Sequence, residues 1–131
     1  GMQMMFDLSY EFGEHQGLGL ISGKVNPIPS TTIDGKSHKI PHIGWSKLIP
    51  AKSDTDWSES ILSEIKYNDP VYFLHSYFAV TSKEENLLAN CCYNGRILSA
   101  VIKKGNLYGC QFHPERSGPI GLKILSKFCY G

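Results

Sequence analysis

The pair Asn94 and Gly95 is the feature of this 131-residue sequence that most limits its fold. Both residue types accept a positive φ angle, and together they are the strongest short-range signal for a two-residue β-hairpin turn. Largely apolar runs at 87–93 and 96–102 flank the pair, and a further turn leads into a third run at 107–112. The sequence therefore predicts an antiparallel meander in this part of the chain.

Helical spacing of apolar residues occurs at both ends of the chain, over 3–12 and after Pro119. The apolar positions are Met4, Met5, Leu8 and Phe12 in the first segment and Ile120, Ile124, Leu125 and Phe128 in the last. Helices at both ends with strands between them predict an α/β domain.

The remaining segments complete this prediction. Residues 20–25 are typical of a short strand and 71–74 of a buried one, whereas 40–49 is typical of an edge or bulged strand. The Pro- and Gly-containing stretch 26–39 is expected to be a loop. Asp54 or Asp56 could cap a short helix with three apolar positions. These are Ile61, Leu62 and Ile65.

Length and composition favour one soluble domain over 1–131, because the chain is too short for two ordinary domains. A net charge of +1 provides no electrostatic footprint for nucleic acid or an anionic membrane. No apolar run approaches the roughly 20 residues that span a bilayer, and the first residues do not resemble a signal peptide. We therefore expect a cytoplasmic protein with neither nucleic acid nor membrane as a partner.

Four cysteines have no spacing that matches a zinc site or a redox motif. They are Cys91, Cys92, Cys110 and Cys129. Without an export signal, free thiols are the expected state. The sequence predicts neither a metal site nor a cofactor.

The densest candidate for chemistry is the segment QFHPE at 111–115. A strand is expected to deliver His113 to the end of a sheet, and Glu115 can turn back toward the imidazole. A carboxylate bonded to one ring nitrogen leaves the other free to act as a general base. The competing interpretation is a strand-end histidine followed by a solvated acidic residue at a helix start.

A base of this kind needs a nucleophile, and the sequence offers no obvious one. No cysteine stands in a strand, sharp turn and helix arrangement. Cys110 is three residues before His113 on the same expected strand, so its side chain points to the opposite face. The sequence therefore offers a candidate base and its orienting acid without an obvious nucleophile.

Several segments together resemble the glutaminase subunit of imidazole glycerol phosphate synthase, a class I glutamine amidotransferase. The segments are GMQMMF at 1–6, GLGLISGKV at 17–25, PHIGW at 41–45, HSY at 75–77 and QFHPERSG at 111–118. The QFHPE motif is general to amidotransferases, whereas PHIGW with HSY narrows the resemblance to this subunit. The resemblance implies the C-terminal portion of a flavodoxin-like, doubly wound domain.

The resemblance also implies roles for individual residues. His113 and Glu115 would be the triad base and its orienting acid. Contacts to the substrate glutamine would come from Gln3, Glu11, Ser76 and Tyr77. Trp45 and Arg116 would lie at the interface with a partner cyclase, a (β/α)8 barrel that receives the ammonia.

The family's nucleophilic cysteine stands two residues before the glycine that aligns with Gly1. The chain is therefore expected to lack that cysteine, to be inactive alone, and to associate with itself to cover an open apolar edge. Three other interpretations stay open. They are a non-catalytic module that binds a partner, an amidotransferase of a surface-polysaccharide sugar pathway, and, most weakly, a metal site formed by His75, His113 and Glu115.

Overall fold

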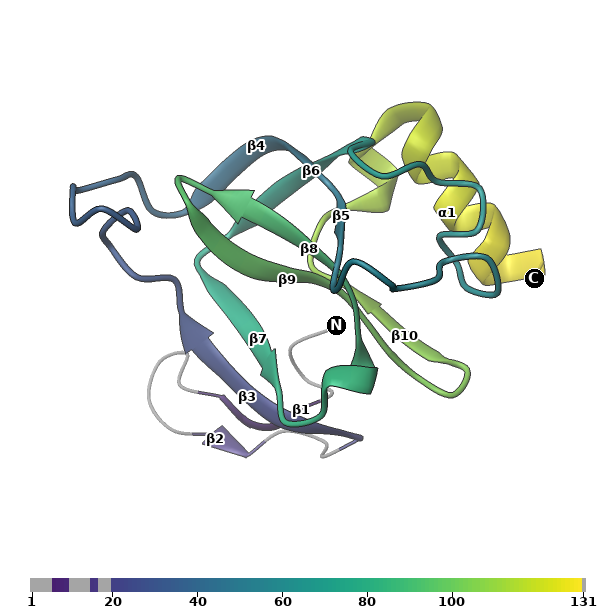
Figure 1. Ribbon diagram of the computed structural model, residues 1–131, viewed down its shortest axis with the longest axis horizontal. Coiled ribbons are helices and arrows are strands. Elements are labelled where there is room, and N and C mark those ends of the chain that lie inside the picture. Colours follow the sequence, from purple (N-terminus) through teal and green to yellow (C-terminus); the bar gives the residue numbers. More distant parts are fainter. Residues whose placement is uncertain (1–5, 10–14, 17–19, 131) are drawn as a thin grey trace.

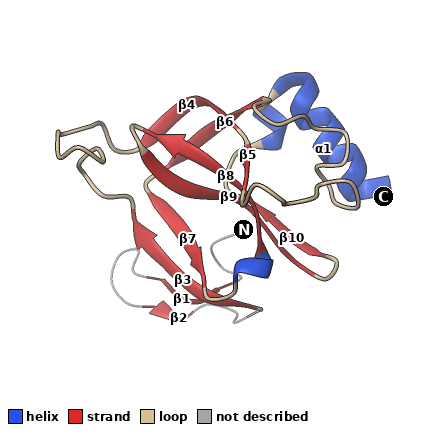
Figure 2. Cartoon of the chain, in the orientation of Figure 1, coloured by secondary structure: helices blue, strands red, loops and turns tan. Residues whose placement is uncertain are grey.

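The computed structural model describes residues 6–9, 15–16 and 20–130, and within this part strands predominate (Figures 1 and 2). The strands are β1 (Phe6–Ser9), β2 (His15–Gln16), β3 (Ile21–Pro27), β4 (His42–Lys47), β5 (Ile49–Pro50), β6 (Pro70–His75), β7 (Tyr77–Thr81), β8 (Leu87–Tyr93), β9 (Arg96–Lys104) and β10 (Leu107–Cys110). The helical elements are the 3-10 turns η2 (Glu84–Asn86) and η3 (Pro114–Arg116) and the α-helix α1 (Gly118–Tyr130).

Three sheets organise these strands. Their orders are β2-β1-β3-β7, β10-β9-β8-β5 and β4-β6. Among the described residues only β1 and β3 pair in parallel, and every other ladder is antiparallel. The doubly wound arrangement implied by the resemblance is thus not formed by this part of the chain.

The meander predicted around Asn94 and Gly95 is confirmed. β8 and β9 pair antiparallel up to Tyr93 and Arg96, and β10 continues the sheet on the other side of β9. Asn94 has φ +51° and Gly95 has φ +84°, both in the left-handed region that a type I′ turn requires. The strands expected at 20–25 and 71–74, the edge strand β4 and the last helix are also present.

The helix predicted over 3–12 is wrong for Phe6–Ser9, which form strand β1. The backbone of β1 pairs with β2 on one side and β3 on the other. Apolar residues at Phe6 and Leu8 also fit the two-residue period of a strand, so the spacing alone was ambiguous. The other residues of that predicted helix lie outside the described part.

The short helix predicted after Asp56 is also wrong, because the segment 57–65 forms consecutive turns. The Asp56 carboxylate accepts a hydrogen bond from the Ser58 amide at 2.9 Å, and the Ser60 hydroxyl accepts one from the Leu62 amide at 3.0 Å. Such local side-chain bonds compete with helical ones. The expected apolar residues are nevertheless buried there, at Ile61, Leu62 and Ile65.

The main core lies between these turns, strands β6, β8 and β9, and helix α1. Its members include Trp57, Leu62, Phe73, Leu98 and Ile124. Figure 1 shows α1 at the same end of the molecule as the 57–65 turns. None of the helices in the described ranges is long and apolar enough to cross a membrane.

Candidate functional site

The segment that carries His113 leaves the meander and crosses to β6. The Gln111 amide donates to the Ala100 carbonyl at 2.8 Å, and Phe112 is buried with its ring edge-on to Phe73. The His113 amide then donates to the Tyr72 carbonyl at 2.9 Å. This segment therefore joins β9 to β6 and holds the His113 backbone at the end of the core.

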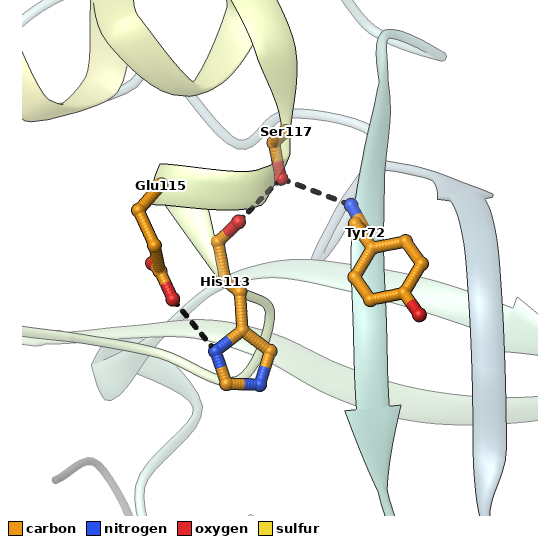
Figure 3. Close-up of polar contacts among 4 residues, drawn as sticks. All are labelled: Tyr72, His113, Glu115 and Ser117. Carbon is orange, nitrogen blue, oxygen red and sulfur yellow. Dashed lines mark hydrogen bonds and ion pairs between the residues drawn. The ribbon is translucent and has the colours of Figure 1, made fainter.

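Pro114 opens the short turn η3, which brings Glu115 back to the imidazole. The His113 Nδ1 atom lies 2.9 Å from Glu115 Oε1. Figure 3 shows the two side chains pointing toward each other. Their side chains are 39% and 60% exposed, so the pair lies at the surface. The hydrogen bond predicted from the motif is therefore present.

The charge state of this pair follows from its hydrogen bonds. The pKa of the Glu115 carboxyl is lowered below its usual range, first by a hydrogen bond from the backbone amide of Glu115 itself and then by the His113 ring. The carboxylate accepts from Nδ1–H, which leaves His113 Nε2 as a proton acceptor. Nε2 has no hydrogen-bond partner within the described residues, so this nitrogen is open to a reacting group.

Ser117 anchors the turn to the neighbouring strand (Figure 3). Its hydroxyl donates to the His113 carbonyl at 2.7 Å and accepts from the Tyr72 amide at 3.0 Å. The side chain is buried, with the residue only 1% exposed. Together with the His113 amide, these contacts bind both backbone groups of Tyr72 to the His113–Ser117 turn.

The structure places the other expected residues that it describes at three locations. Ser76 and Tyr77 form the corner between β6 and β7. Trp45 lies on β4, 58% exposed, with its ring edge-on to Tyr72 at 5.9 Å. Arg116 is exposed in η3 next to Glu115. Gln3 and Glu11 lie outside the described residues.

Two histidines of the PHIGW and HSY motifs meet in the interior. The His42 Nδ1 and His75 Nε2 atoms lie 2.8 Å apart, and the residues are 2% and 6% exposed. Burial lowers the pKa of His75, and a charge on His113 lowers it further against the opposing effect of the Tyr77 carbonyl. The two motifs are thus in contact below the surface that carries His113.

The cysteines do not complete a triad within the described part of the chain. Burial raises the pKa of the Cys91 and Cys110 thiols to about 12 in each case. Cys92 and Cys129 are exposed, and none of the four bonds to His113 there. A thiol with so high a pKa is a poor nucleophile near neutral pH.

The interpretation as a metal site through His75, His113 and Glu115 is not supported. No three His, Cys, Asp or Glu side chains among the described residues are grouped so that they could hold a metal ion.

Reasoning from the sequence missed three residues that shape the site. Tyr72 and Ser117 are 45 positions apart, and no periodicity connects them. The serine of the QFHPERSG segment could have indicated the anchor, because a serine just before a helix often forms hydrogen bonds between its hydroxyl and backbone groups. His42 lies in the PHIGW motif, but no sequence pattern pointed to a role for it.

Comparison with known proteins provides an independent view. The family described as "Glutamine amidotransferase class-I" matches residues 1–131. The chain is 52% identical to "Imidazole glycerol phosphate synthase subunit HisH 1" of Legionella pneumophila (strain Lens), over 98% of its own length and 60% of that protein.

Two further relatives, both named "Imidazole glycerol phosphate synthase subunit HisH", come from Geobacillus sp. (strain WCH70) and Lactococcus lactis subsp. lactis (strain IL1403). They are 45% and 44% identical, each over 98% of this chain and 57% of the relative. The chain thus spans less than two thirds of the length of the curated relatives it matches.

Proposed function

Because this chain belongs to the class I glutamine amidotransferase family, we propose that it acts within the glutaminase subunit of an imidazole glycerol phosphate synthase. That subunit hydrolyses glutamine and passes the ammonia to a cyclase in histidine biosynthesis. The observation that carries the proposal is the 2.9 Å contact between His113 Nδ1 and Glu115 Oε1, with Nε2 unbonded as far as the described residues go. The similarity to relatives that bear this subunit's name supports the same assignment.

The chemistry of the pair fits this reaction. A neutral imidazole with its tautomer set by a carboxylate can take a proton from a thiol and return it to the leaving amine. The Glu115 charge stabilises the imidazolium formed between these two steps. His113 is therefore the proposed general base and acid, and Glu115 its orienting residue.

The proposed nucleophile is a cysteine in the part of the relatives' length that this chain does not span. The raised pKa of Cys91 and Cys110 supports this proposal, since neither thiol suits the role. The same part of the relatives' length would complete the doubly wound sheet of the whole domain. By itself the chain would be inactive and would associate with itself.

The proposed substrate and partner contacts follow the motifs. Glutamine would be held by Gln3, Glu11 and the corner at Ser76 and Tyr77. Trp45, an exposed indole whose ring contacts Tyr72, would meet the barrel cyclase together with Arg116. The reaction would take place in the cytoplasm.

The test measures glutaminase activity of the full-length protein mixed with the barrel cyclase of its own organism. The His113→Asn variant should lose about 10³-fold in kcat, because a triad without its base retains little catalysis. The matched control His38→Asn changes a histidine between β3 and β4 and should stay within about threefold of the unchanged protein. Equal activity of His113→Asn and His38→Asn would refute the proposed role.

A further inference from the structure

His42 and His75 are buried histidines that the proposed reaction does not use. They stand directly opposite each other on the paired strands β4 and β6. Four polar groups form a continuous chain of hydrogen bonds, which runs from the Ser46 hydroxyl through both imidazoles to the Tyr77 carbonyl. The distances are 2.9 Å from Ser46 Oγ to His42 Nε2, 2.8 Å between the rings, and 2.9 Å from His75 Nδ1 to the carbonyl oxygen.

The line of hydrogen bonds has a fixed direction when both rings are neutral. A carbonyl oxygen can only accept, so His75 Nδ1 must carry the hydrogen. Its Nε2 is then an acceptor, and His42 Nδ1 must donate to it. His42 Nε2 is left as an acceptor for the Ser46 hydroxyl. Each imidazole therefore has a single allowed tautomer.

The surroundings keep both rings neutral. Burial, then the neighbouring His75 and His38, lower the pKa of His42 to about 4. Burial also lowers the pKa of His75, and the electrostatic effect of His113 lowers it further, against the opposing hydrogen bond to the Tyr77 carbonyl. His42 additionally stacks with Phe73 and Tyr93, at centroid distances of 4.9 and 4.3 Å. No acidic group of the described residues contributes to either shift, so neither ring has a carboxylate partner there that favours protonation.

The Tyr77 carbonyl lies at a structural junction. β6 ends at His75 and β7 begins at Tyr77, so Ser76 alone separates two strands that belong to different sheets. The His75 bond reaches across Ser76 and closes this bend. A second contact, from the Ile28 amide to the Ser76 carbonyl at 2.9 Å, ties the corner to the end of β3.

We propose that His42 and His75 are positioning residues for glutamine binding, because their ordered hydrogen bonds hold the corner at Ser76 and Tyr77 in one geometry. This inference rests on the proposed function, in which that corner lines the glutamine pocket. Neither imidazole touches substrate. Loss of the bond from His75 to the Tyr77 carbonyl lets the corner relax and weakens substrate binding, while the reacting groups around His113 stay in place.

The first test compares two substitutions of His75 in the full-length protein with its cyclase. In His75→Asn the side-chain amide nitrogen stands near the former Nδ1 and can still donate to the Tyr77 carbonyl. In His75→Gln the amide reaches the former Nε2 instead, and that donor is lost.

The expected result is a separation of KM from kcat. His75→Gln should raise KM for glutamine at least about tenfold with kcat within about threefold, while His75→Asn keeps both within about threefold of the unchanged protein. An unchanged KM in His75→Gln, or equal losses in both variants, would overturn the inference. His38→Gln is the matched histidine control.

A second measurement does not depend on any variant folding. Nitrogen-15 NMR of the imidazoles in the unchanged chain should show His42 and His75 neutral at pH 7, both with the hydrogen on Nδ1. A hydrogen on Nε2 of either ring, or a charged ring at pH 7, would contradict the proposed order.

The two proposals fail in different ways. An unchanged full-length protein without glutaminase activity would refute the proposed function, and with it the glutamine-binding role of the corner. An active protein in which His75→Gln leaves KM unchanged would refute only the role of the histidine pair.

Discussion

His113 pairs with Glu115 at the surface, whereas His42 pairs with His75 in the interior, at similar distances of 2.9 and 2.8 Å. At the surface a carboxylate bonds one ring nitrogen of His113, and the other has no hydrogen-bond partner in the described part of the chain. In the interior both nitrogens of each ring are bonded within the protein. The first arrangement suits proton transfer and the second suits structural support, so the hydrogen bonding of the ring nitrogens, more than the residue type, distinguishes the two pairs.

The supports of the two pairs also differ. The surface pair depends on backbone hydrogen bonds that hold η3 and Ser117 against the first turn of α1. The interior pair depends on burial and stacking against Phe73 and Tyr93. Substitutions that remove one support should therefore leave the other pair intact.

The largest expected effect on stability is that of Gly121→Ala, because this substitution disturbs the packing of α1 against η3, which supports the surface pair. A Cβ atom there would lie 1.8 Å from the Pro114 carbonyl oxygen and 2.8 Å from its carbon, so backbone must shift. We expect the free energy of unfolding to fall by about 3–4 kcal/mol, despite the better helix propensity of alanine. Urea unfolding measures this loss. Leu122→Ala, at an exposed position of the same helix, is the control and should change stability by less than about 1 kcal/mol.

The second effect is a pH dependence that belongs to the interior pair. The unfolded chain binds a proton on His42 near pH 6.5, whereas the folded chain does so only near pH 4. Between these values the unfolded state holds more protons, so stability falls as pH falls. The loss from pH 7 to pH 4 should be about 2–3 kcal/mol from this residue.

The His42→Phe variant tests this assignment, because phenylalanine can still stack but cannot take up a proton. Its stability should fall less between pH 7 and pH 4 than that of the unchanged chain, in thermal unfolding followed by circular dichroism. His38→Phe should keep most of the original pH dependence. A pH profile of His42→Phe identical to that of the unchanged chain would show that His42 does not titrate as described.

A smaller effect is expected for Ser117→Ala. It removes two hydrogen bonds and leaves the Tyr72 amide without its partner, which should cost about 1–2 kcal/mol of unfolding free energy. Ser126→Ala, an exposed serine of α1, should change stability by less than about 0.5 kcal/mol. If the two variants were equally stable, Ser117 would not anchor the His113 turn.

The smallest effect on stability is expected for Glu115→Gln. The pair is solvent-exposed, and exposed ion pairs contribute about 0–1 kcal/mol at most. Chemical unfolding should therefore barely distinguish this variant from the unchanged chain. A loss as large as that of Gly121→Ala would mean that the surface pair supports the fold, which would remove the contrast between the two histidine pairs.

The local chemistry of the sequence was sufficient to predict several elements of the structure. Asn94 and Gly95 specify the hairpin because few other residues accept two successive positive φ angles. His113 and Glu115 could be paired from the sequence because they stand two residues apart, on either side of a proline that starts a turn. Pro119 and the apolar spacing after it located the last helix.

Tertiary structure decided what local pattern left ambiguous. Phe6–Ser9 form a strand because β2 and β3 offer their backbones on either side, and the segment 57–65 buries its apolar residues in turns instead of a helix. His42 and His75 are 33 positions apart, and Tyr72 and Ser117 are 45 apart. Contacts at such separations depend on how strands pair and pack, which no short window of sequence specifies. The sequence by itself therefore determined the pairing of His113 with Glu115, and only the packed sheets determined the buried pair and the anchors around it.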